Sequence, residues 1–148
     1  MNKEAIISLW QEAFGDTKEE IEFFIDNVNN AECLNISDGD ELLAMLYFVE
    51  CYINGREGRY IYAACTAERH RNEGLMTALL HNAEKHCSNY ICLIPATESL
   101  ADFYIKRGFT EKADISELQF FQSDEIKEYL LEGFSLQHPV ILIKELEG

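Results

Sequence analysis

Basic residues are scarce in this sequence: 12 Lys and Arg stand against 27 Asp and Glu, which gives a formal net charge of -15. Binding to a nucleic-acid backbone relies on clustered Lys and Arg that displace counterions, so the composition argues against a nucleic-acid partner. A negative field instead concentrates cationic ligands such as protonated amines, although acidity also serves solubility. The charge therefore favours a cationic partner over a polyanionic one.

Long apolar runs are also missing. No stretch approaches the roughly 18 apolar residues that a membrane span needs. The opening residues, Met1-Asn2-Lys3-Glu4, lack the apolar stretch of a signal peptide. We therefore expect a cytoplasmic protein with no membrane partner.

Proline and paired cysteines are few. The two prolines, Pro95 and Pro139, and the lack of a Pro/Ser-rich linker mark no domain boundary, so a single domain is expected over residues 1–148. The cysteines are odd in number, scattered and without a CxxC pair, which predicts buried free thiols and no metal site. They are Cys33, Cys51, Cys65, Cys87 and Cys92.

Hydrophobic spacing predicts the order of helices and strands. The expected elements are a helix ending at Gly15, a helix capped by Thr17 and Glu20, strands 34–36 and 42–53 around a hairpin turn, a turn over 54–58, a strand 59–66, a helix from 75 to 87, a strand 90–94, a helix 98–107, a strand 117–121, a helix 124–131 and a strand 140–144. The strand, helix and strand between residues 59 and 94 predict a parallel pair with a right-handed crossover. We therefore expect an α/β (α+β) fold with an antiparallel meander beside a parallel pair in one mixed sheet.

The segment Arg71-Asn72-Glu73-Gly74-Leu75-Met76 joins a buried strand to an amphipathic helix. The first turn of a helix carries backbone N–H groups without intrahelical partners and the positive end of the helix dipole, so it can hold a phosphate. Gly74 would let the backbone approach the ligand, and Arg71 could add a charge-assisted bond. Six residues alone leave open an ordinary strand-to-helix turn with a surface arginine.

Two longer stretches carry a family resemblance. Residues 60–80 resemble the acetyl-CoA signature of the GNAT (Gcn5-related N-acetyltransferase) superfamily, in which a strand leads into R/Q-x-x-G-x-G/A and an amphipathic helix. Arg71 and Gly74 match the signature, whereas Asn72, Glu73 and Met76 depart from the residues that the family prefers. Residues 91–109 are similar to the family's next strand and to its helix ending in F-Y-x-K-x-G-F. The helix over residues 9–16 also looks like the first helix of some bacterial members.

The resemblance implies acetyl-CoA as cosubstrate, a parallel strand pair that splays apart, and direct attack of a primary amine on the thioester. The CoA pyrophosphate would lie on the backbone of Arg71, Asn72, Glu73, Gly74, Leu75 and Met76. The pantetheine arm would bind the amides of Ala64, Cys65 and Thr66, and an amide near Ala64 would polarise the thioester carbonyl. Ordinary sheet pairing is the alternative for these three strand residues.

Two side chains are candidates for catalysis. Tyr104 matches the family tyrosine that lies near the CoA sulfur and can protonate the departing thiolate; the alternative is a core or half-buried tyrosine whose hydroxyl merely finds a partner. The general base varies across the family. Glu50, at the end of an apolar run, is our candidate, although such a position is more typical of an ordinary strand-end carboxylate, and Glu98 and His70 are weaker candidates. Cys65 is not predicted to be a nucleophile, because a cysteine in an apolar strand is usually inert.

The identity of the acceptor stays open. We expect a small-molecule or protein amine, with a cationic one favoured by the acidic composition, and the C-terminal region leaves a homodimer open. Two other functions compete with catalysis. One is a non-catalytic CoA-binding or regulatory module, suggested by Met76 and Glu73, and the other is a protein-interaction domain that keeps only the scaffold.

Overall fold

The structure is a computed structural model, and it describes residues 2–87, 89–132, 134 and 138–146. The helices in this part of the chain are α1 (Lys3–Phe14), α2 (Lys18–Asn27), α3 (Leu75–Glu84), α4 (Glu98–Ile105) and α5 (Asp124–Leu130). The strands are β1 (Ala31–Asp38), β2 (Glu41–Ile53), β3 (Arg56–Thr66), β4 (Tyr90–Leu93), β5 (Glu111–Ala113), β6 (Leu118–Gln119) and β7 (Ile141–Glu145). None of these helices is long and apolar enough to cross a membrane.

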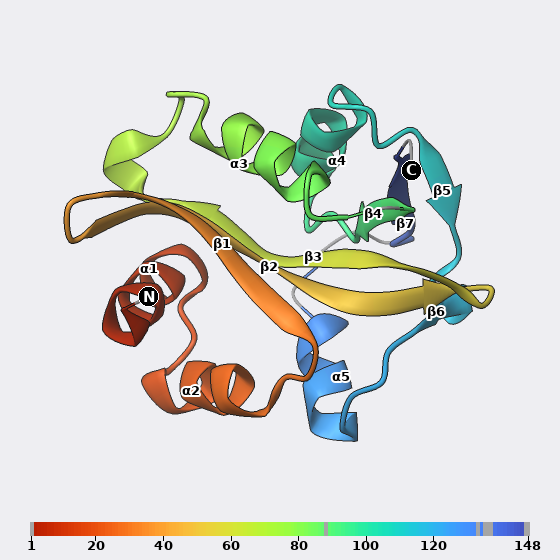
Figure 1. Cartoon of the computed structure of the whole chain (residues 1–148), viewed down its shortest axis with the longest axis horizontal. Coiled ribbons are helices and arrows are strands. Elements are labelled where there is room, and N and C mark those ends of the chain that lie inside the picture. The colour runs from red at the N-terminus through yellow and green to blue at the C-terminus, as the bar shows by residue number, and fades with distance from the viewer. Residues whose placement is uncertain (1, 88, 133, 135–137, 147–148) are drawn as a thin grey trace.

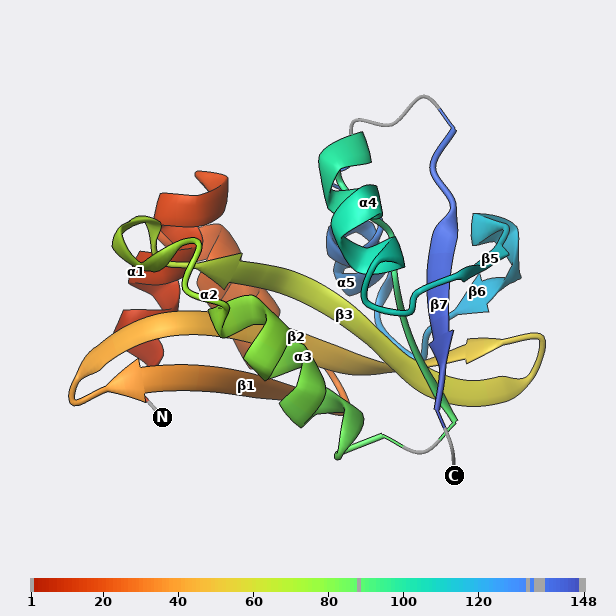
Figure 2. The same cartoon turned by 90° about the horizontal axis from the view of Figure 1, so that it is seen from above.

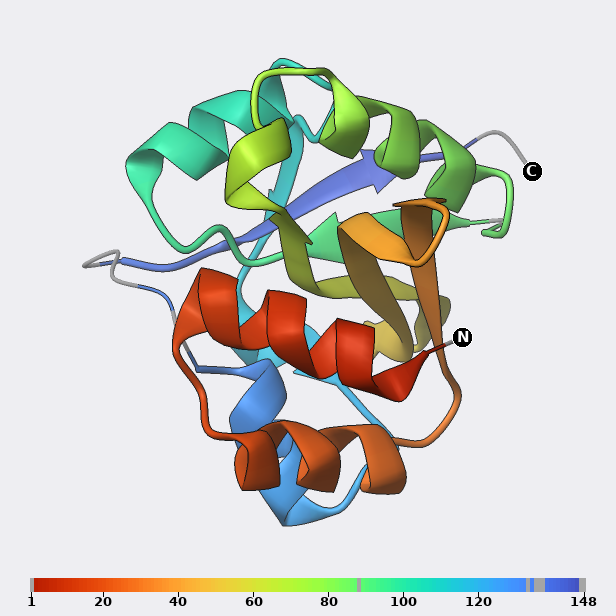
Figure 3. The ribbon, with the colours of Figure 1, turned by 90° about the vertical axis from the view of Figure 1, so that its left-hand side faces the viewer.

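One mixed sheet separates two helical layers (Figures 1 and 3). Its strands run in the order β1-β2-β3-β4-β7-β5, and β6 pairs with β2 outside this path. Helices α3 and α4 pack on one face through a core that includes Leu79, Leu80 and Tyr104. Helices α1, α2 and α5 cover the other face, with Trp10 and Phe24 in their core. The predicted mixed α/β fold with its antiparallel meander and parallel pair is confirmed.

Local capping explains where the first two helices begin and end. Helix α1 ends at Gly15, whose φ of 76° is a left-handed conformation that glycine adopts without steric cost. Helix α2 begins with the predicted capping box, because Thr17 accepts from the backbone of Glu20 and Glu20 accepts from the backbone of Thr17. The short link between the helices therefore has a fixed course.

Strands β3 and β4 pair over only two positions. Arg59 lies opposite Ile91 and Tyr60 opposite Cys92, after which the two strands run apart (Figure 2). On its other edge β3 stays paired with β2, but the register shifts between Met45 and Tyr47, where Ala63 adopts a φ of 55°. This is a β-bulge, which bends the strand that carries the extra residue. Among the described residues, the edge of β3 that faces β4 therefore has no partner strand from Ile61 onward.

The predicted turn over residues 54–58 is wrong at its C-terminal end. The turn consists of Asn54 and Gly55, whose φ values of 51° and 79° fit a two-residue hairpin loop, and β3 begins at Arg56. Gly58 lies inside β3. The residue there must be small, because a Cβ would come within 2.2 Å of the Tyr90 ring. The Tyr90 hydroxyl donates a hydrogen bond of 2.9 Å to the carbonyl oxygen of Arg56. Gly58 thus makes room for a β4 side chain to lie over β3.

Other boundaries differ from the sequence prediction in smaller ways. Helix α3 ends before Cys87, and α4 ends at Ile105, ahead of a turn that reaches Gly108 at a φ of 101°. Most of the strand expected over residues 117–121 is absent: a 3₁₀ helix, Ile115–Glu117, precedes the two-residue β6. Strand β7 lies antiparallel between β4 and β5, a position that periodicity alone did not predict.

Replacing Gly58 with alanine should lower the free energy of unfolding by about 2 to 3 kcal/mol, because the new methyl group overlaps the buried Tyr90 ring. Urea denaturation followed by circular dichroism measures the loss. Tyr90→Ala is the matched background, because it removes the overlapping ring. Gly58→Ala should cost far less there, and equal costs in the two backgrounds would contradict the proposed packing.

Candidate functional site

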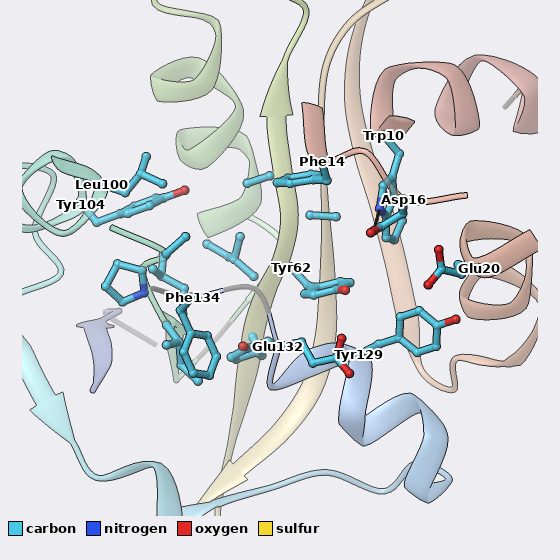
Figure 4. A pocket seen from close by; sticks show the side chains of 18 residues that line it. Trp10, Phe14, Asp16, Glu20, Tyr62, Leu100, Tyr104, Tyr129, Glu132 and Phe134 are labelled. Atoms are coloured by element: carbon cyan, nitrogen blue, oxygen red, sulfur yellow. Dashed lines mark hydrogen bonds between the residues drawn. The ribbon is translucent and has the colours of Figure 1, made fainter. Parts of the chain in front are cut away.

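A cavity of about 300 Å³ lies where β3 and β4 separate (Figure 4). Residues of β3 run along it, β4 with the following loop and α4 form one side, and α1, the link to α2, and the end of α5 form the other. The lining residues are Trp10, Phe14, Asp16, Glu20, Tyr60, Ile61, Tyr62, Ala63, Ala64, Leu93, Ile94, Pro95, Ala96, Leu100, Tyr104, Tyr129, Glu132 and Phe134. Its size is at the small end of ligand-binding pockets.

Tyr104 brings a hydroxyl to the α4 side of the cavity. The residue is only 7% exposed, and its ring packs edge-on against Phe103 and Phe109 at centroid distances of 5.2 and 5.5 Å. The hydroxyl has no hydrogen-bond partner among the described residues and points toward β3 (Figure 4). Burial raises the pKa of Tyr104 to about 12, so the phenol stays protonated at neutral pH and can donate a hydrogen bond.

Of the three β3 residues predicted to bind the pantetheine arm, only one lines the cavity. Ala64 lines the cavity directly after the bulged Ala63, whereas Cys65 and Thr66 continue the strand beyond it. Cys65 is buried, and burial raises the pKa of its thiol to about 12. The cavity therefore contacts the stretch of β3 that has lost its β4 partner.

The predicted pyrophosphate turn is exposed and follows β3 after a short 3₁₀ helix. A 3₁₀ helix, Glu68–His70, leads into Arg71, and α3 begins at Leu75. Asn72 and Gly74 have φ values of 66° and 77°, and no side chain caps the start of α3. The N–H groups of the first helical turn are thus open to an anionic ligand.

The two departures from the GNAT signature that raised doubt have partners within the fold. An oxygen of Glu73 lies 3.3 Å from Nδ1 of His70, and Nε2 of the same ring lies 3.3 Å from Glu41. The side chain of Met76 packs against the core beneath α3 and α4. These contacts give both side chains a place in the fold, and the non-catalytic module stays an alternative that binding and turnover measurements decide.

The structure does not bring the candidate bases together with Tyr104. Glu50 lies on β2 opposite Arg59 and does not line the cavity. Glu98 begins α4 without lining the cavity, and His70 lies in the turn between two carboxylates. The role of Glu50 as a base stays a prediction that the cavity geometry does not favour.

Sequence reasoning missed the acidic side of the cavity, where Asp16, Glu20 and Glu132 lie. Oδ2 of Asp16 accepts a hydrogen bond of 2.9 Å from Nε1 of Trp10. The glycine cap at Gly15 could have drawn attention to Asp16, because it fixes the direction in which the chain leaves α1. Glu132 follows α5 in a region without a readable motif, and only the tertiary fold places it here.

Comparison with known proteins gives a family match and a set of similar folds. Residues 2–111 match the family model described as an acetyltransferase (GNAT) domain. An acetyltransferase of the GNAT family from Staphylococcus aureus Mu50 superposes with a TM-score of 0.65 at 14% identity, over 99% of this chain and 96% of that one. No curated protein matches the sequence significantly.

Two further solved structures are similar. An aminoglycoside 6'-N-acetyltransferase complexed with coenzyme A has a TM-score of 0.56 at 14% identity, over 97% of this chain and 89% of that one. The glucosamine N-acetyltransferase region of a fungal multi-domain β-N-acetylglucosaminidase has a TM-score of 0.61 at 13% identity, over 71% of this chain. This chain spans only 15% of the fungal protein. Identities this low show a shared fold.

Alkylation should show that Cys65 is not a nucleophile. Burial raises the pKa of the Cys33 and Cys65 thiols to about 12 and that of Cys87 to about 11, so almost no thiolate is present at pH 8. Iodoacetamide should therefore modify these residues at least about 100-fold more slowly than free cysteine, whose pKa is about 8.5. The rates, measured by peptide mass spectrometry, should rise about tenfold per pH unit from pH 8 to 10. Modification of Cys65 at the rate of free cysteine would instead indicate a covalent route.

Proposed function

The chain belongs to the GNAT acetyltransferase family, and we propose that it transfers the acetyl group of acetyl-CoA to a primary amine held in the cavity between β3 and β4. The observation that carries this proposal is the hydroxyl of the buried Tyr104, which has no described partner and faces the unpaired edge of β3 across the cavity. Among the described residues no buried side-chain N or O atom lacks a partner, so this hydroxyl opens onto the cavity, where a ligand can accept a hydrogen bond from it.

The residues of the turn fit the pyrophosphate of a CoA molecule. The open N–H groups at the start of α3 supply donors and the positive end of the helix dipole, and the exposed Arg71 can add a charge-assisted bond. Gly74 leaves space at the turn, because a Cβ built on it would meet nothing within 4 Å. The free edge of β3 then offers backbone groups to the pantetheine arm from Thr66 back toward Ala64.

Bound acetyl-CoA supplies an acyl thioester, which an uncharged amine can attack directly. The C–N bond forms as the C–S bond breaks, the amine loses one proton and the sulfur gains one, so the products are an amide and a free thiol. In this proposal a β3 amide near Ala64 donates to the thioester oxygen as negative charge develops on it. Holding both reactants in one cavity lowers the entropic part of the barrier.

Tyr104 acts best as a hydrogen-bond donor to the departing sulfur. With its pKa raised to about 12, the phenol is a much weaker acid than an ordinary thiol at about 8.5, so complete transfer of its proton to the thiolate is uphill. A hydrogen bond that strengthens as charge grows on sulfur avoids this cost. The proton lost by the amine then supplies the net proton that the thiolate needs.

Charge reversal in the turn tests the cofactor part of the proposal. Arg71→Glu should weaken acetyl-CoA binding by about 10- to 100-fold, which corresponds to the loss of a charge-assisted hydrogen bond. Isothermal titration calorimetry measures the effect. Lys112→Glu is the matched control, because it makes the same charge change on the exposed strand β5 and should leave binding unchanged. If the unmodified protein binds no acetyl-CoA at millimolar concentration, the proposed function is wrong.

Removing one oxygen tests the role of Tyr104. Tyr104→Phe keeps the ring contacts with Phe103 and Phe109 but removes the donor, so kcat should fall by about 100-fold while the KM for acetyl-CoA stays within about twofold. The release of free thiol from acetyl-CoA, followed with a panel of primary amines, reports the rate. An unchanged kcat would assign Tyr104 to packing alone.

A further inference from the structure

Arg107 lies in the turn after α4 and reaches across to α3, which covers the same face of the sheet (Figure 1). Its Nε donates a hydrogen bond of 2.9 Å to Oγ1 of Thr77, in the first turn of α3. Its Nη1 donates to the carbonyl oxygen of Phe103 at 2.8 Å, and the guanidinium carbon lies 3.5 Å from the centroid of the Phe103 ring. Two hydrogen bonds and a ring contact therefore hold this half-buried guanidinium beside the start of α3.

The guanidinium of Arg107 keeps donors that the fold does not use. Its Nη2 has no hydrogen-bond partner among the described residues. No buried side-chain N or O atom in that part of the chain lacks a partner, so Nη2 is open to the surface. A ligand can therefore reach it without displacing any contact that holds Arg107 in place.

Arg107 is also unusual in having no acidic partner. Three of the five arginines, Arg56, Arg59 and Arg69, pair with a glutamate. Among the described residues no carboxylate lies within 4.0 Å of the other two, Arg71 and Arg107, although the chain has 27 acidic residues. Both lie near the start of α3, one in the turn before the helix and the other bonded to its first turn. Two arginines left unpaired at one place in an acidic chain favour an anion from outside the chain.

We propose that Arg107 binds a phosphate group of the acyl-CoA cosubstrate, as a second cationic contact beside the turn at Arg71. This inference rests on the proposed function for the identity of the cosubstrate. The family resemblance does not supply it, because the pattern F-Y-x-K-x-G-F leaves the position of Arg107 open. The guanidinium carries the inference, since it is fixed at the start of α3 with Nη2 unused. A planar guanidinium held in this way binds phosphate oxygens with little loss of side-chain entropy.

Arg107 also connects this end of the cosubstrate to Tyr104. The backbone N–H of Arg107 donates a hydrogen bond of 2.9 Å to the carbonyl oxygen of Tyr104. Burial raises the pKa of Tyr104 to about 12, and the positive charge of Arg107 counteracts part of that rise. A phosphate held by Arg107 therefore steadies the turn that follows Tyr104 on the chain.

A shortened ligand separates a phosphate contact from a structural role. CoA carries the phosphates, and pantetheine carries the same thiol arm without them. Arg107→Met keeps an apolar stem against Phe103 but removes the charge, so it should weaken CoA binding by about tenfold or more and leave pantetheine binding within about twofold. Isothermal titration calorimetry measures CoA directly and pantetheine by its competition with CoA. Equal losses for both ligands would overturn the inference, because they would assign Arg107 to joining α4 to α3.

Two further variants control for charge. Lys112→Met removes one positive charge on the exposed strand β5 and should change CoA affinity by less than about twofold. Arg107→Lys restores the charge without the planar fork, so it should bind CoA at least about threefold more tightly than Arg107→Met. A loss in Lys112→Met equal to that in Arg107→Met would show that only the overall field acts. No recovery in Arg107→Lys would also count against a phosphate contact.

Dephospho-CoA, which lacks the 3'-phosphate, identifies the phosphate that Arg107 contacts. If the loss caused by Arg107→Met persists with this ligand, the contact is to the pyrophosphate. If the loss disappears, the contact is to the 3'-phosphate. Either result supports the inference, whereas an undiminished affinity for CoA itself overturns it.

Thiol release from acetyl-CoA with a panel of amines distinguishes the failure of this inference from that of the proposed function. CoA binding that depends on Arg107, without thiol release, would leave the phosphate contact standing and reject the acetyltransferase proposal. Thiol release together with unchanged CoA affinity in Arg107→Met would support the transferase and overturn the phosphate contact. If the unmodified protein binds no CoA, both are wrong.

Discussion

The site depends on the contact between Gly58 and Tyr90. The Tyr90 ring occupies the space that a side chain at position 58 would need, so it packs β4 against β3 at one end of the parallel pair. Its hydroxyl also donates a hydrogen bond to the carbonyl oxygen of Arg56 on β3. Beyond Tyr60 nothing pairs the two strands, and the bulge at Ala63 bends β3 away. The cavity exists because the pair is fixed at one end and free at the other. An even ladder along the whole pair would use the β3 backbone groups that the proposed thioester ligand would need.

The sequence predicted those parts of the fold that depend on neighbouring residues. The capping box of Thr17 and Glu20, the glycine cap of α1 and the strand-to-helix turn at Gly74 are local events, and each lies where the pattern indicated. Gly58 was assigned to a turn because glycine is common in turns, and the reason for its presence is a ring from a distant strand. The position of β7 between β4 and β5 likewise depends on long-range pairing that a single apolar run does not encode.

The residues of the candidate site likewise fall into a group that local motifs identify and a group that only the tertiary fold brings together. Tyr104, Ala64 and the turn at Arg71 belong to contiguous motifs, so their resemblance to a family singles them out from the sequence alone. The acidic side of the cavity has no such motif, because its residues come from three separate segments. Asp16 lies in the link after α1, Glu20 in the first turn of α2, and Glu132 shortly after α5. Glu50 was chosen from its strand alone, and the strand order places it away from the cavity. A strand pattern gives the alternation of side chains but not which neighbouring edge stays open.

The net charge of -15 is not spread evenly along the proposed reaction path. The turn before α3 presents Arg71 and the positive end of a helix dipole, which suit an anionic cofactor. The far end of the cavity carries Asp16, Glu20 and Glu132, and Glu20 already accepts a hydrogen bond from the backbone of Thr17. Trp10 links this electrostatic arrangement to the core, because the same buried indole that packs against Phe24 and Tyr62 also orients Asp16.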